Sequence, residues 1–307
     1  MIAGPTCSGK SGLALALAER LGGTVINADS MQVYRELRIL TARPTAAEEA
    51  RVPHRLYGVR PAGEPGSVAW WRGAALAEME ACRLPILCGG TGLYLQALAT
   101  GLAEIPEPGE AARAEARWLL AAEGPAALHA RLLAVDPETA AGLRPSDGQR
   151  LARAWEVWRA TGIGLAAWQR AAGPPAPYRF RLIVFDPDRS ELRAVVEARF
   201  GAMLQAGALD EVRDLLALGL DPALPAMRAV GVPELAEYLR GEIDLAVAQE
   251  RAVAATRRYV KRQATWFRNR RIAEQTRTRI IHAIFRSVKQ FSEREWAEMV
   301  RFVCDQG

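Results

Sequence analysis

The sequence predicts an α/β protein in which helices flank a parallel sheet and an all-helical insertion interrupts the pattern. Three observations support this fold class. A glycine-rich loop follows a short apolar segment at the very start and opens a helix, and further short apolar stretches then alternate with helical segments. Between about residues 101 and 175 this alternation stops. Strands that alternate with helices in this way usually form a parallel sheet.

The glycine-rich loop reads Gly4-Pro5-Thr6-Cys7-Ser8-Gly9-Lys10-Ser11, which is the G-x-x-x-x-G-K-[ST] pattern of a phosphate-binding P-loop. We expect its backbone N–H groups and the N-terminus of the next helix to hold phosphate oxygens. Lys10 would reach the terminal phosphates, and the Ser11 hydroxyl would bind Mg²⁺. Only three of the 40 basic residues are lysines, which supports a special role for Lys10. The core should therefore be P-loop NTPase-like.

Apolar stretches predict strands at residues 1–3, 24–28, 85–88 and 180–185, with a weaker candidate at 55–59. The first of these is unusually short for a buried strand. Two of them end in polar motifs, Asp29-Ser30-Met31-Gln32 and Gly89-Gly90-Thr91-Gly92. Ligands bind at the carboxyl ends of strands in open α/β sheets. Asp29 and Thr91 should therefore face the same crevice as the P-loop.

Helical spacing predicts helices at residues 68–82, at 190–218 with an interruption at Gly207, and at 250–271. We assign residues 1–101 and 176–270 to the α/β core, 102–175 to a helical insertion, and 271–307 to a C-terminal helical tail without readable chemistry. The insertion carries four tryptophans, which we expect mostly to pack in a small core of its own, with base stacking as the alternative. They are Trp118, Trp155, Trp158 and Trp168.

Composition narrows the class of protein. Half of the 307 residues are apolar, yet no run reaches the roughly 18 residues of a membrane span. Functional sequence begins at once, so we expect no signal peptide. The four cysteines form no Cys-x-x-Cys pair and the three histidines are scattered, which argues against a zinc site or a disulfide framework. We expect a cytoplasmic enzyme that has no membrane contact and acts as a monomer.

Basic charge is concentrated in one segment. Residues 251–289 contain twelve lysines and arginines and a single acid, whereas the whole chain carries a net charge of only +5. Such a block on an otherwise mildly acidic protein favours a nucleic-acid partner over a merely solvated helix face. Within it, aromatic and basic residues interleave in Lys261-Arg262-Gln263-Ala264-Thr265-Trp266-Phe267-Arg268. This pattern suits RNA, although a core face with solvated charges would also produce it.

Six motifs, in order, resemble those of the tRNA dimethylallyltransferases, from about residue 4 to residue 268. They are the P-loop, Asp29-Ser30-Met31-Gln32-Val33-Tyr34, Thr41-Ala42-Arg43-Pro44, Pro53-His54-Arg55-Leu56, Gly89-Gly90-Thr91-Gly92-Leu93-Tyr94 and Lys261-Arg262-Gln263-Ala264-Thr265-Trp266.

The resemblance implies that the P-loop holds the pyrophosphate of dimethylallyl diphosphate rather than ATP. The dimethylallyl group would pass to N6 of the adenosine that follows the tRNA anticodon on its 3′ side (position 37), with release of pyrophosphate. Asp29 would be the general base, its alternative being a Mg²⁺ ligand or strand cap. Thr91 would lie near the bridging oxygen and Arg228 over the diphosphate.

The resemblance also implies contacts with the tRNA anticodon stem-loop, which the insertion would grip. The residues concerned are Asp29, Ser30, Met31, Gln32, Gln149, Arg150, Leu151, Ala152, Arg153, Arg228, Lys261, Arg262, Gln263, Trp266 and Arg268. Two positions depart from the family pattern, Cys7 in place of the usual alanine and Val232-Pro233 after Gly231. The rival interpretation is a P-loop small-molecule or nucleoside kinase, and a third is an RNA-binding protein without catalysis.

Overall fold

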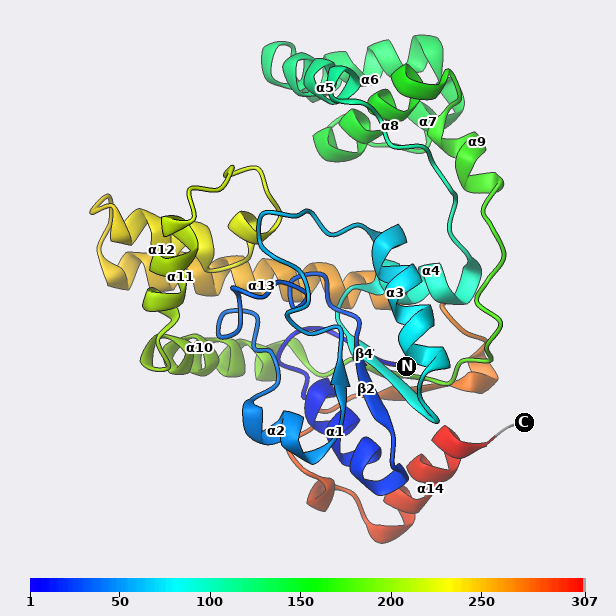
Figure 1. The fold of residues 1–307 in the computed structure, drawn as a ribbon, viewed down its shortest axis with the longest axis vertical. Helices are drawn as coiled ribbons and strands as arrows, with labels where there is room; N and C mark the ends of the chain where they lie inside the picture. The colour runs from blue at the N-terminus through cyan, green and yellow to red at the C-terminus, as the bar shows by residue number, and fades with distance from the viewer. Residues whose placement is uncertain (306–307) are drawn as a thin grey trace. The chain divides into compact units, whose positions relative to one another are not determined.

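The computed structural model describes residues 1–305. The chain divides into two compact units, of which the first combines Met1–Ala99 with Pro177–Gly307 and the second is Thr100–Ala176. We call them the core unit and the insertion unit; Figure 1 shows the elements of each. Within residues 1–305, no helix combines the length and the apolar character that crossing a membrane would require.

The core unit contains a parallel sheet of six strands, which confirms the predicted fold class. Its spatial order is β3-β2-β4-β1-β5-β6, and every neighbouring pair is parallel. The strands are β1 (Ile2–Ala3), β2 (Thr24–Asn27), β3 (His54–Arg55), β4 (Pro85–Gly89), β5 (Leu182–Phe185) and β6 (Thr278–Ile281). The weak candidate at 55–59 is thus a two-residue strand that begins one residue earlier. The short first strand is central in the sheet, between β4 and β5.

Helices pack on the sheet through apolar faces. Leu13 and Leu17 of α1 and Met299 of α14 share one buried cluster with Ile183 of β5, so α1 and α14 cover the same face, and they lie side by side in Figure 1. The helices of the core unit are α1 (Lys10–Leu21), α2 (Ala46–Arg51), α3 (Val68–Glu80), α4 (Gly92–Thr100), α10 (Arg189–Gln205), α11 (Ala208–Ala217), α12 (Val232–Leu239), α13 (Leu245–Asn269) and α14 (Glu293–Cys304). Three short 3₁₀ helices are η1 (Ala226–Arg228), η2 (Gln275–Arg277) and η3 (Val288–Gln290).

The insertion unit is a helical bundle with its own apolar core. Leu119, Leu128, Leu132 and Leu151 are buried in one cluster. Trp155 belongs to that cluster and packs against Trp158, as the packing interpretation predicts, whereas Trp118 is 62% exposed. The helices are α5 (Glu110–Ala122), α6 (Gly124–Val135), α7 (Pro137–Ala141), α8 (Gly148–Thr161) and α9 (Leu165–Arg170).

The C-terminal segment corrects the prediction of a purely helical tail. Residues 278–281 form β6, which pairs with β5 at the sheet edge, and up to residue 305 only α14 follows as an α-helix. The strand is short and contains an arginine, and Ile280 is 54% exposed while Ile281 is buried. An edge strand needs only one apolar face, so its apolar signal in the sequence is weak.

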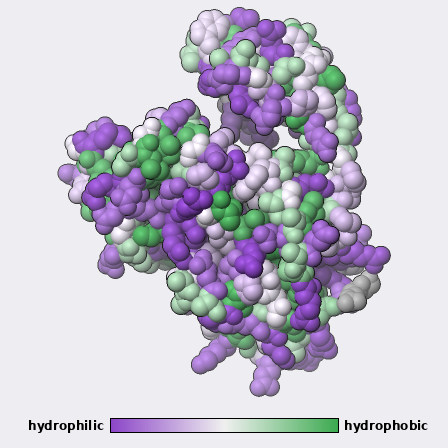
Figure 2. All heavy atoms as spheres, in the orientation of Figure 1, coloured by the Kyte–Doolittle hydropathy of each residue, from purple (hydrophilic) through white to green (hydrophobic). Residues whose placement is uncertain are grey.

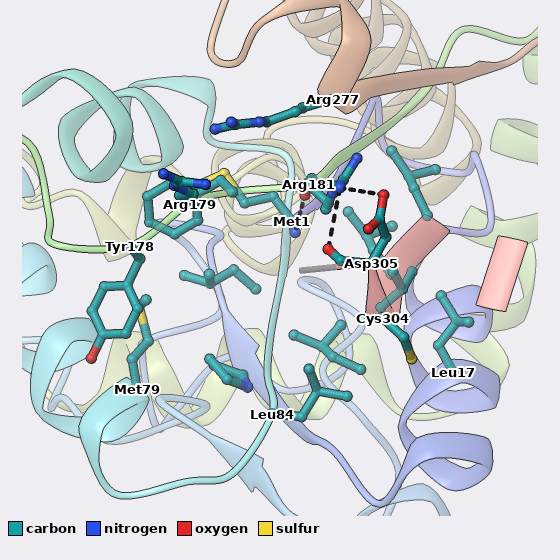
Figure 3. A pocket seen from close by; sticks show the side chains of 17 residues that line it. Met1, Leu17, Met79, Leu84, Tyr178, Arg179, Arg181, Arg277, Cys304 and Asp305 are labelled. Carbon is teal, nitrogen blue, oxygen red and sulfur yellow. Dashed lines mark hydrogen bonds and ion pairs between the residues drawn. The ribbon is translucent and has the colours of Figure 1, made fainter. Parts of the chain in front are cut away.

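A cavity of about 360 Å³ lies at the amino ends of the strands, where Met1, Pro85 and Arg181 line it. Figure 3 shows Arg181 beside Asp305, to which it donates hydrogen bonds at 3.2 Å (backbone O) and 2.7 Å (Oδ2). The P-loop follows β1 at the opposite end of the strands. The cavity is therefore separate from the polar motifs that the sequence singles out.

Candidate active site

The P-loop turns directly into α1. Gly9 caps the helix in the left-handed conformation, with φ 82°, and the first N–H groups of α1 have no intrahelical acceptor. Pro5 has no N–H, and its carbonyl accepts hydrogen bonds from Ser8 N (3.3 Å) and Lys10 Nζ (3.4 Å). The loop thus offers backbone donors and a lysine at the positive end of a helix, which is a site for anions.

The surroundings of Lys10 make the pKa of its ammonium depend on whether an anion is bound. Removal from water lowers the pKa of its ammonium below the usual value, and Arg199 acts in the same direction. The nearby Cys88 and Asp29 oppose this shift. Burial also raises the pKa of the Cys88 thiol to about 11, so this thiol stays neutral at pH 7 and gives Lys10 no full counter-charge. A bound diphosphate would supply it.

Arg199 of α10 is a site residue that the sequence analysis missed. Its Nη1 donates to Thr6 Oγ1 at 3.3 Å and lies 3.6 Å from Cys7 Sγ. The available signal was an arginine on the apolar face of an amphipathic helix, since it follows buried Leu192 by seven residues and Val196 by three. Arg199 brings a second cation to the P-loop.

Asp29 follows β2 and is fixed by local hydrogen bonds. Its Oδ1 accepts from Met31 N at 3.0 Å, and its own N–H donates to Asn27 Oδ1 at 2.8 Å. Asn27 is fully buried, and its Nδ2 also donates to the carbonyl oxygens of Asp29 and Leu56, both at 3.0 Å. Trp71 of α3 donates to the Asn27 carbonyl at 2.8 Å. The carboxylate is therefore held on a rigid turn and keeps Oδ2 for another partner.

Thr91 joins the loop after β4 to the loop after β2. Its Oγ1 accepts from Ser30 N at 2.9 Å and donates to Ser30 Oγ at 3.2 Å. Its N–H donates to the Ala28 carbonyl at 3.2 Å. The structure thus brings Thr91 beside the Asp29 turn, as the strand-end argument predicts.

Tyr259 of α13 also lies at this junction, and the sequence analysis did not single it out. Burial raises the pKa of its hydroxyl, and the charge of Asp29 adds to the effect, whereas hydrogen bonds with Thr91 and Gln263 oppose it. A helical periodicity analysis could have found it, because Tyr259 lies four residues before Gln263 on the same helix face.

Gln263 and Trp266 point into the core unit rather than outward. Gln263 is only 5% exposed, and its amide accepts from Thr6 N at 2.9 Å and donates to the Gly90 carbonyl at 3.0 Å. Trp266 is half-buried against Gly92. This burial argues against the direct contact of Gln263 with tRNA that the resemblance implies.

The other residues implied in RNA binding are dispersed. Arg228 is exposed in η1, and Arg199 is instead the arginine in hydrogen-bond contact with the P-loop. Gln32 uses its Nε2 to hold the carbonyls of Thr41 and Ala42, each at 2.9 Å. Arg268 is paired with Asp186, at 2.6 Å for Nη2, while Lys261 and Arg262 are exposed.

In the insertion unit, α8 presents part of the implied set to solvent. Gln149 and Arg150 are exposed, and Arg153 and Ala152 are partly so. Leu151 is fully buried in the apolar core of the unit, which argues against a side-chain contact with tRNA.

Ser11 is exposed in the first turn of α1, where its hydroxyl can reach a cation bound to phosphate. Within residues 1–305 no group of three or more histidine, cysteine or acidic side chains could hold a metal ion. A Mg²⁺ ion would therefore depend on Ser11, phosphate oxygens and water, a donor set that this ion accepts.

Comparisons with known proteins show the family of the chain. A family model described as IPP transferase matches residues 32–270, and one described as Isopentenyl transferase matches residues 1–60. The tRNA dimethylallyltransferase of Granulibacter bethesdensis is 61% identical over 307 residues, which cover 98% of this chain and 96% of that protein.

The solved tRNA isopentenylpyrophosphate transferase of Bacillus halodurans is 32% identical, with a TM-score of 0.68 over 99% of this chain and 94% of that one. A eukaryotic dimethylallyltransferase acting on tRNA shares the fold, with a TM-score of 0.79 at 24% identity over 100% and 79% of the two chains. Because the first family model covers most of the sequence and the bacterial relative matches almost all of it, the chain belongs to the IPP transferase family.

Proposed function

We propose that this protein transfers the dimethylallyl group of dimethylallyl diphosphate to N6 of the adenosine on the 3′ side of the tRNA anticodon. One observation carries the proposal. A P-loop with two cations, Lys10 and Arg199, is joined by hydrogen bonds to the strand-end loops that carry Thr91 and Asp29. The leaving group and the nucleophile thus have adjacent, rigid supports. The resemblance in six ordered motifs supports the same reaction.

In this reaction a bond forms between adenine N6 and C1 of the dimethylallyl group while the bond from C1 to the diphosphate oxygen breaks. The electron pair of the broken bond stays on pyrophosphate. The P-loop N–H groups, Lys10 and Arg199 stabilise that growing negative charge. The Thr91 hydroxyl would donate to the bridging oxygen in place of Ser30 Oγ, its acceptor in the ligand-free structure. Asp29 accepts the proton that N6 loses, through the oxygen that Met31 does not occupy.

Mg²⁺ is the cofactor that we assign to the site. When bound, it neutralises charge on the diphosphate oxygens and so assists departure of pyrophosphate. Ser11 would hold it together with those oxygens. Removing divalent cations with a chelator should therefore abolish transfer, and Ser11→Ala should raise the Mg²⁺ concentration needed for half-maximal rate.

The basic residues support tRNA as the acceptor. A groove of about 450 Å³ lies between α10 and α13, and its apolar floor includes Leu192, Val196 and Val260. Hydrophilic residues cover much of the face shown in Figure 2. The cations that line the groove are Arg189, Arg193, Arg257, Arg258, Lys261 and Arg268. Contacts between such cations and phosphates release counterions, so tRNA binding should weaken steeply with salt.

The insertion unit would add contacts to the anticodon stem-loop through Gln149, Arg150 and Arg153 on α8. The target base must leave its stack to reach Asp29, so we expect base flipping. Proteins that recognise a specific RNA sequence usually bind unpaired, unstacked bases in loops. We propose that one copy of the chain suffices for all of these contacts, which size-exclusion chromatography with and without tRNA would test.

One assay separates this function from a kinase. Purified protein is mixed with unmodified tRNA, Mg²⁺ and dimethylallyl diphosphate that is radiolabelled in the carbon chain. We expect label in the tRNA at the adenosine next to the anticodon, and a tRNA with another base there should remain unlabelled. ATP consumption without transfer of label would overturn the proposal in favour of phosphoryl transfer. Salt-sensitive tRNA binding without either reaction would favour the non-catalytic interpretation.

A further inference from the structure

Gln263 is one of few polar side chains buried in the core unit. Both ends of its amide are used, because Oε1 accepts from Thr6 N at 2.9 Å and Nε2 donates to Gly90 O at 3.0 Å. Turning the amide over would set NH₂ against an N–H donor and oxygen against a carbonyl. Its orientation is therefore fixed by its two partners.

These two partners belong to the two halves of the site. Thr6 is in the P-loop, and Gly90 directly precedes Thr91 in the loop after β4. Gln263 thus spans the P-loop and the loop that carries Thr91, from a helix more than 170 residues away in sequence from the nearer partner. Its two hydrogen bonds set the spacing between the P-loop, which we call the diphosphate cradle, and the loop that carries Thr91, on the side of the site where the nucleophile would lie.

The glycines after β4 leave room for this arrangement. A Cβ on Gly90 would lie 2.1 Å from Gln263 Nε2, and a Cβ on Gly92 would lie 2.1 Å from the Trp266 ring. Gln263 and Trp266 are three residues apart and lie on one face of α13. Both side chains therefore pack against the loop that follows β4. Any side chain at position 90 would displace the amide.

The hydrogen bond between Thr6 N–H and Gln263 limits which P-loop N–H groups can bind the diphosphate. Thr6 N–H is already bonded to Gln263, and Pro5 has no N–H, so donors to phosphate must come from later in the loop and from the first turn of α1. Without Gln263, Thr6 N–H and the Gly90 carbonyl would both lose their partners. Unpaired groups of this kind are costly when buried, which would favour another loop geometry.

We propose that Gln263 is a positioning residue that aligns the diphosphate cradle with Thr91 and Asp29, and that it does not contact tRNA. This inference rests on the proposed function. It assigns Gln263 an effect on diphosphate binding and on the transfer step, while neighbouring exposed Lys261 on the same helix affects tRNA binding. The two residues therefore separate two roles within one sequence motif.

The test compares Gln263→Met, which keeps size and removes the hydrogen bonds to Thr6 and Gly90 together with the one to Tyr259, with Lys261→Met. Binding of Mg²⁺ and inorganic pyrophosphate is measured by calorimetry without RNA, tRNA binding by filter retention, and transfer by steady-state kinetics. We expect Gln263→Met to lose about ten- to hundredfold in pyrophosphate affinity and in kcat, with tRNA affinity within about twofold of wild type. Lys261→Met should lower tRNA affinity and leave pyrophosphate binding intact.

A second set of variants tests the contact from the other side. Gly90→Ala should reproduce the losses because its methyl group displaces the Gln263 amide. Gly90→Ala combined with Gln263→Ala should lose little more than Gln263→Ala alone, since the overlap is gone. Thermal unfolding of each variant identifies losses that come from misfolding, and additive losses in folded variants would overturn the inference.

The outcomes also separate this inference from the proposed function. If Gln263→Met raises the KM for tRNA and binds pyrophosphate like wild type, the positioning role is wrong while prenyl transfer stands. If the wild-type protein binds no pyrophosphate and transfers no label, both proposals fail.

Discussion

The backbone N–H of Phe285 donates to the carbonyl of Ser8 at 3.0 Å, so the P-loop rests on a segment that lies almost at the other end of the chain. The contact continues at Gly9, where a Cβ would lie 2.0 Å from the Phe285 oxygen. Phe285 is buried in the same apolar cluster as Leu13 and Met299. The segment after β6 therefore supplies support that the two residues of β1 could not provide alone.

Gly9→Ala should disable the P-loop. The position combines a φ of 82° with the overlap against Phe285, so the added methyl group meets both backbone strain and backbone atoms. Gly241→Ala is a matched control, because its φ is 74° but nothing lies within 4 Å of the added Cβ. We expect the control to cost about 1–2 kcal/mol of stability and to leave pyrophosphate binding unchanged. Gly9→Ala should be less stable than the control and lose pyrophosphate binding, as measured by thermal unfolding and calorimetry. Equal behaviour of the two variants would mean that Phe285 does not constrain the loop.

Arg199→Gln should weaken diphosphate binding more than Arg228→Gln. Arg199 donates to Thr6 in the P-loop, whereas Arg228 is exposed in η1. Loss of one positioned donor to a developing negative charge typically costs about 100- to 1,000-fold in kcat. We expect that range for Arg199→Gln, together with weaker binding of pyrophosphate without RNA. Arg228→Gln should bind pyrophosphate like wild type and show its effect in tRNA affinity. The reverse ranking would return the diphosphate role to Arg228.

These two arginines illustrate what the sequence could and could not predict. The P-loop and the strand-end motifs are contiguous, and strands have a local apolar signature, so the fold class and the positions of Asp29 and Thr91 could be predicted. Arg199 meets Thr6 across 193 residues and Gln263 meets it across 257. The place of Arg199 on the apolar face of its helix is a local signal, but it does not indicate which partner the side chain meets. The diphosphate role of Arg228, which the resemblance implies, stays a prediction, whereas the hydrogen bond of Arg199 to the P-loop depends on how α10 packs.

The edge strand β6 shows the same limit on a larger scale. Its partner β5 precedes it by almost a hundred residues, and its four residues carry only one buried side chain. Pairing with β5, rather than local propensity, makes this segment a strand. The local sequence of the tail therefore could not predict the pairing with β5, which brings the segment after β6 to the P-loop.

Asp29→Asn should reduce kcat by about 100- to 10,000-fold, the usual contribution of a general base. Asparagine keeps an oxygen for the hydrogen bond from Met31 N, so the turn should persist and the KM for both substrates should change little. Asp186→Asn is the control, since this carboxylate follows β5, which β4 and β1 separate from β2, and it pairs with Arg268 instead. Single-turnover rates at saturating substrates would measure the chemical step. Retention of the wild-type rate by Asp29→Asn would remove Asp29 from the role of base.

Lys10 makes diphosphate binding depend on pH. Desolvation lowers its pKa below the ordinary 10.5 in the ligand-free protein, and a bound anion raises it again. At a pH between these two pKa values, diphosphate binding makes Lys10 take up a proton. The affinity for diphosphate should therefore fall as pH rises through the lowered pKa, by at most about tenfold per pH unit. Above the lowered pKa, Lys10 is more protonated in the unfolded chain than in the folded one. The contribution of Lys10 to the free energy of unfolding of the ligand-free protein should therefore rise with pH up to about 10.5.

Calorimetry with pyrophosphate in buffers of different ionisation enthalpy measures that proton uptake directly. Lys10→Arg is the control, because its guanidinium stays charged and the titration of pyrophosphate itself is common to both proteins. The variant should bind more weakly near neutral pH, since a planar fork replaces a compact ammonium, and the extra pH dependence should vanish. If wild type and variant lose affinity in parallel as pH rises, Lys10 does not titrate in this range. The ammonium would then be held charged by its surroundings even without an anion, which would contradict the desolvation that its place behind the P-loop implies.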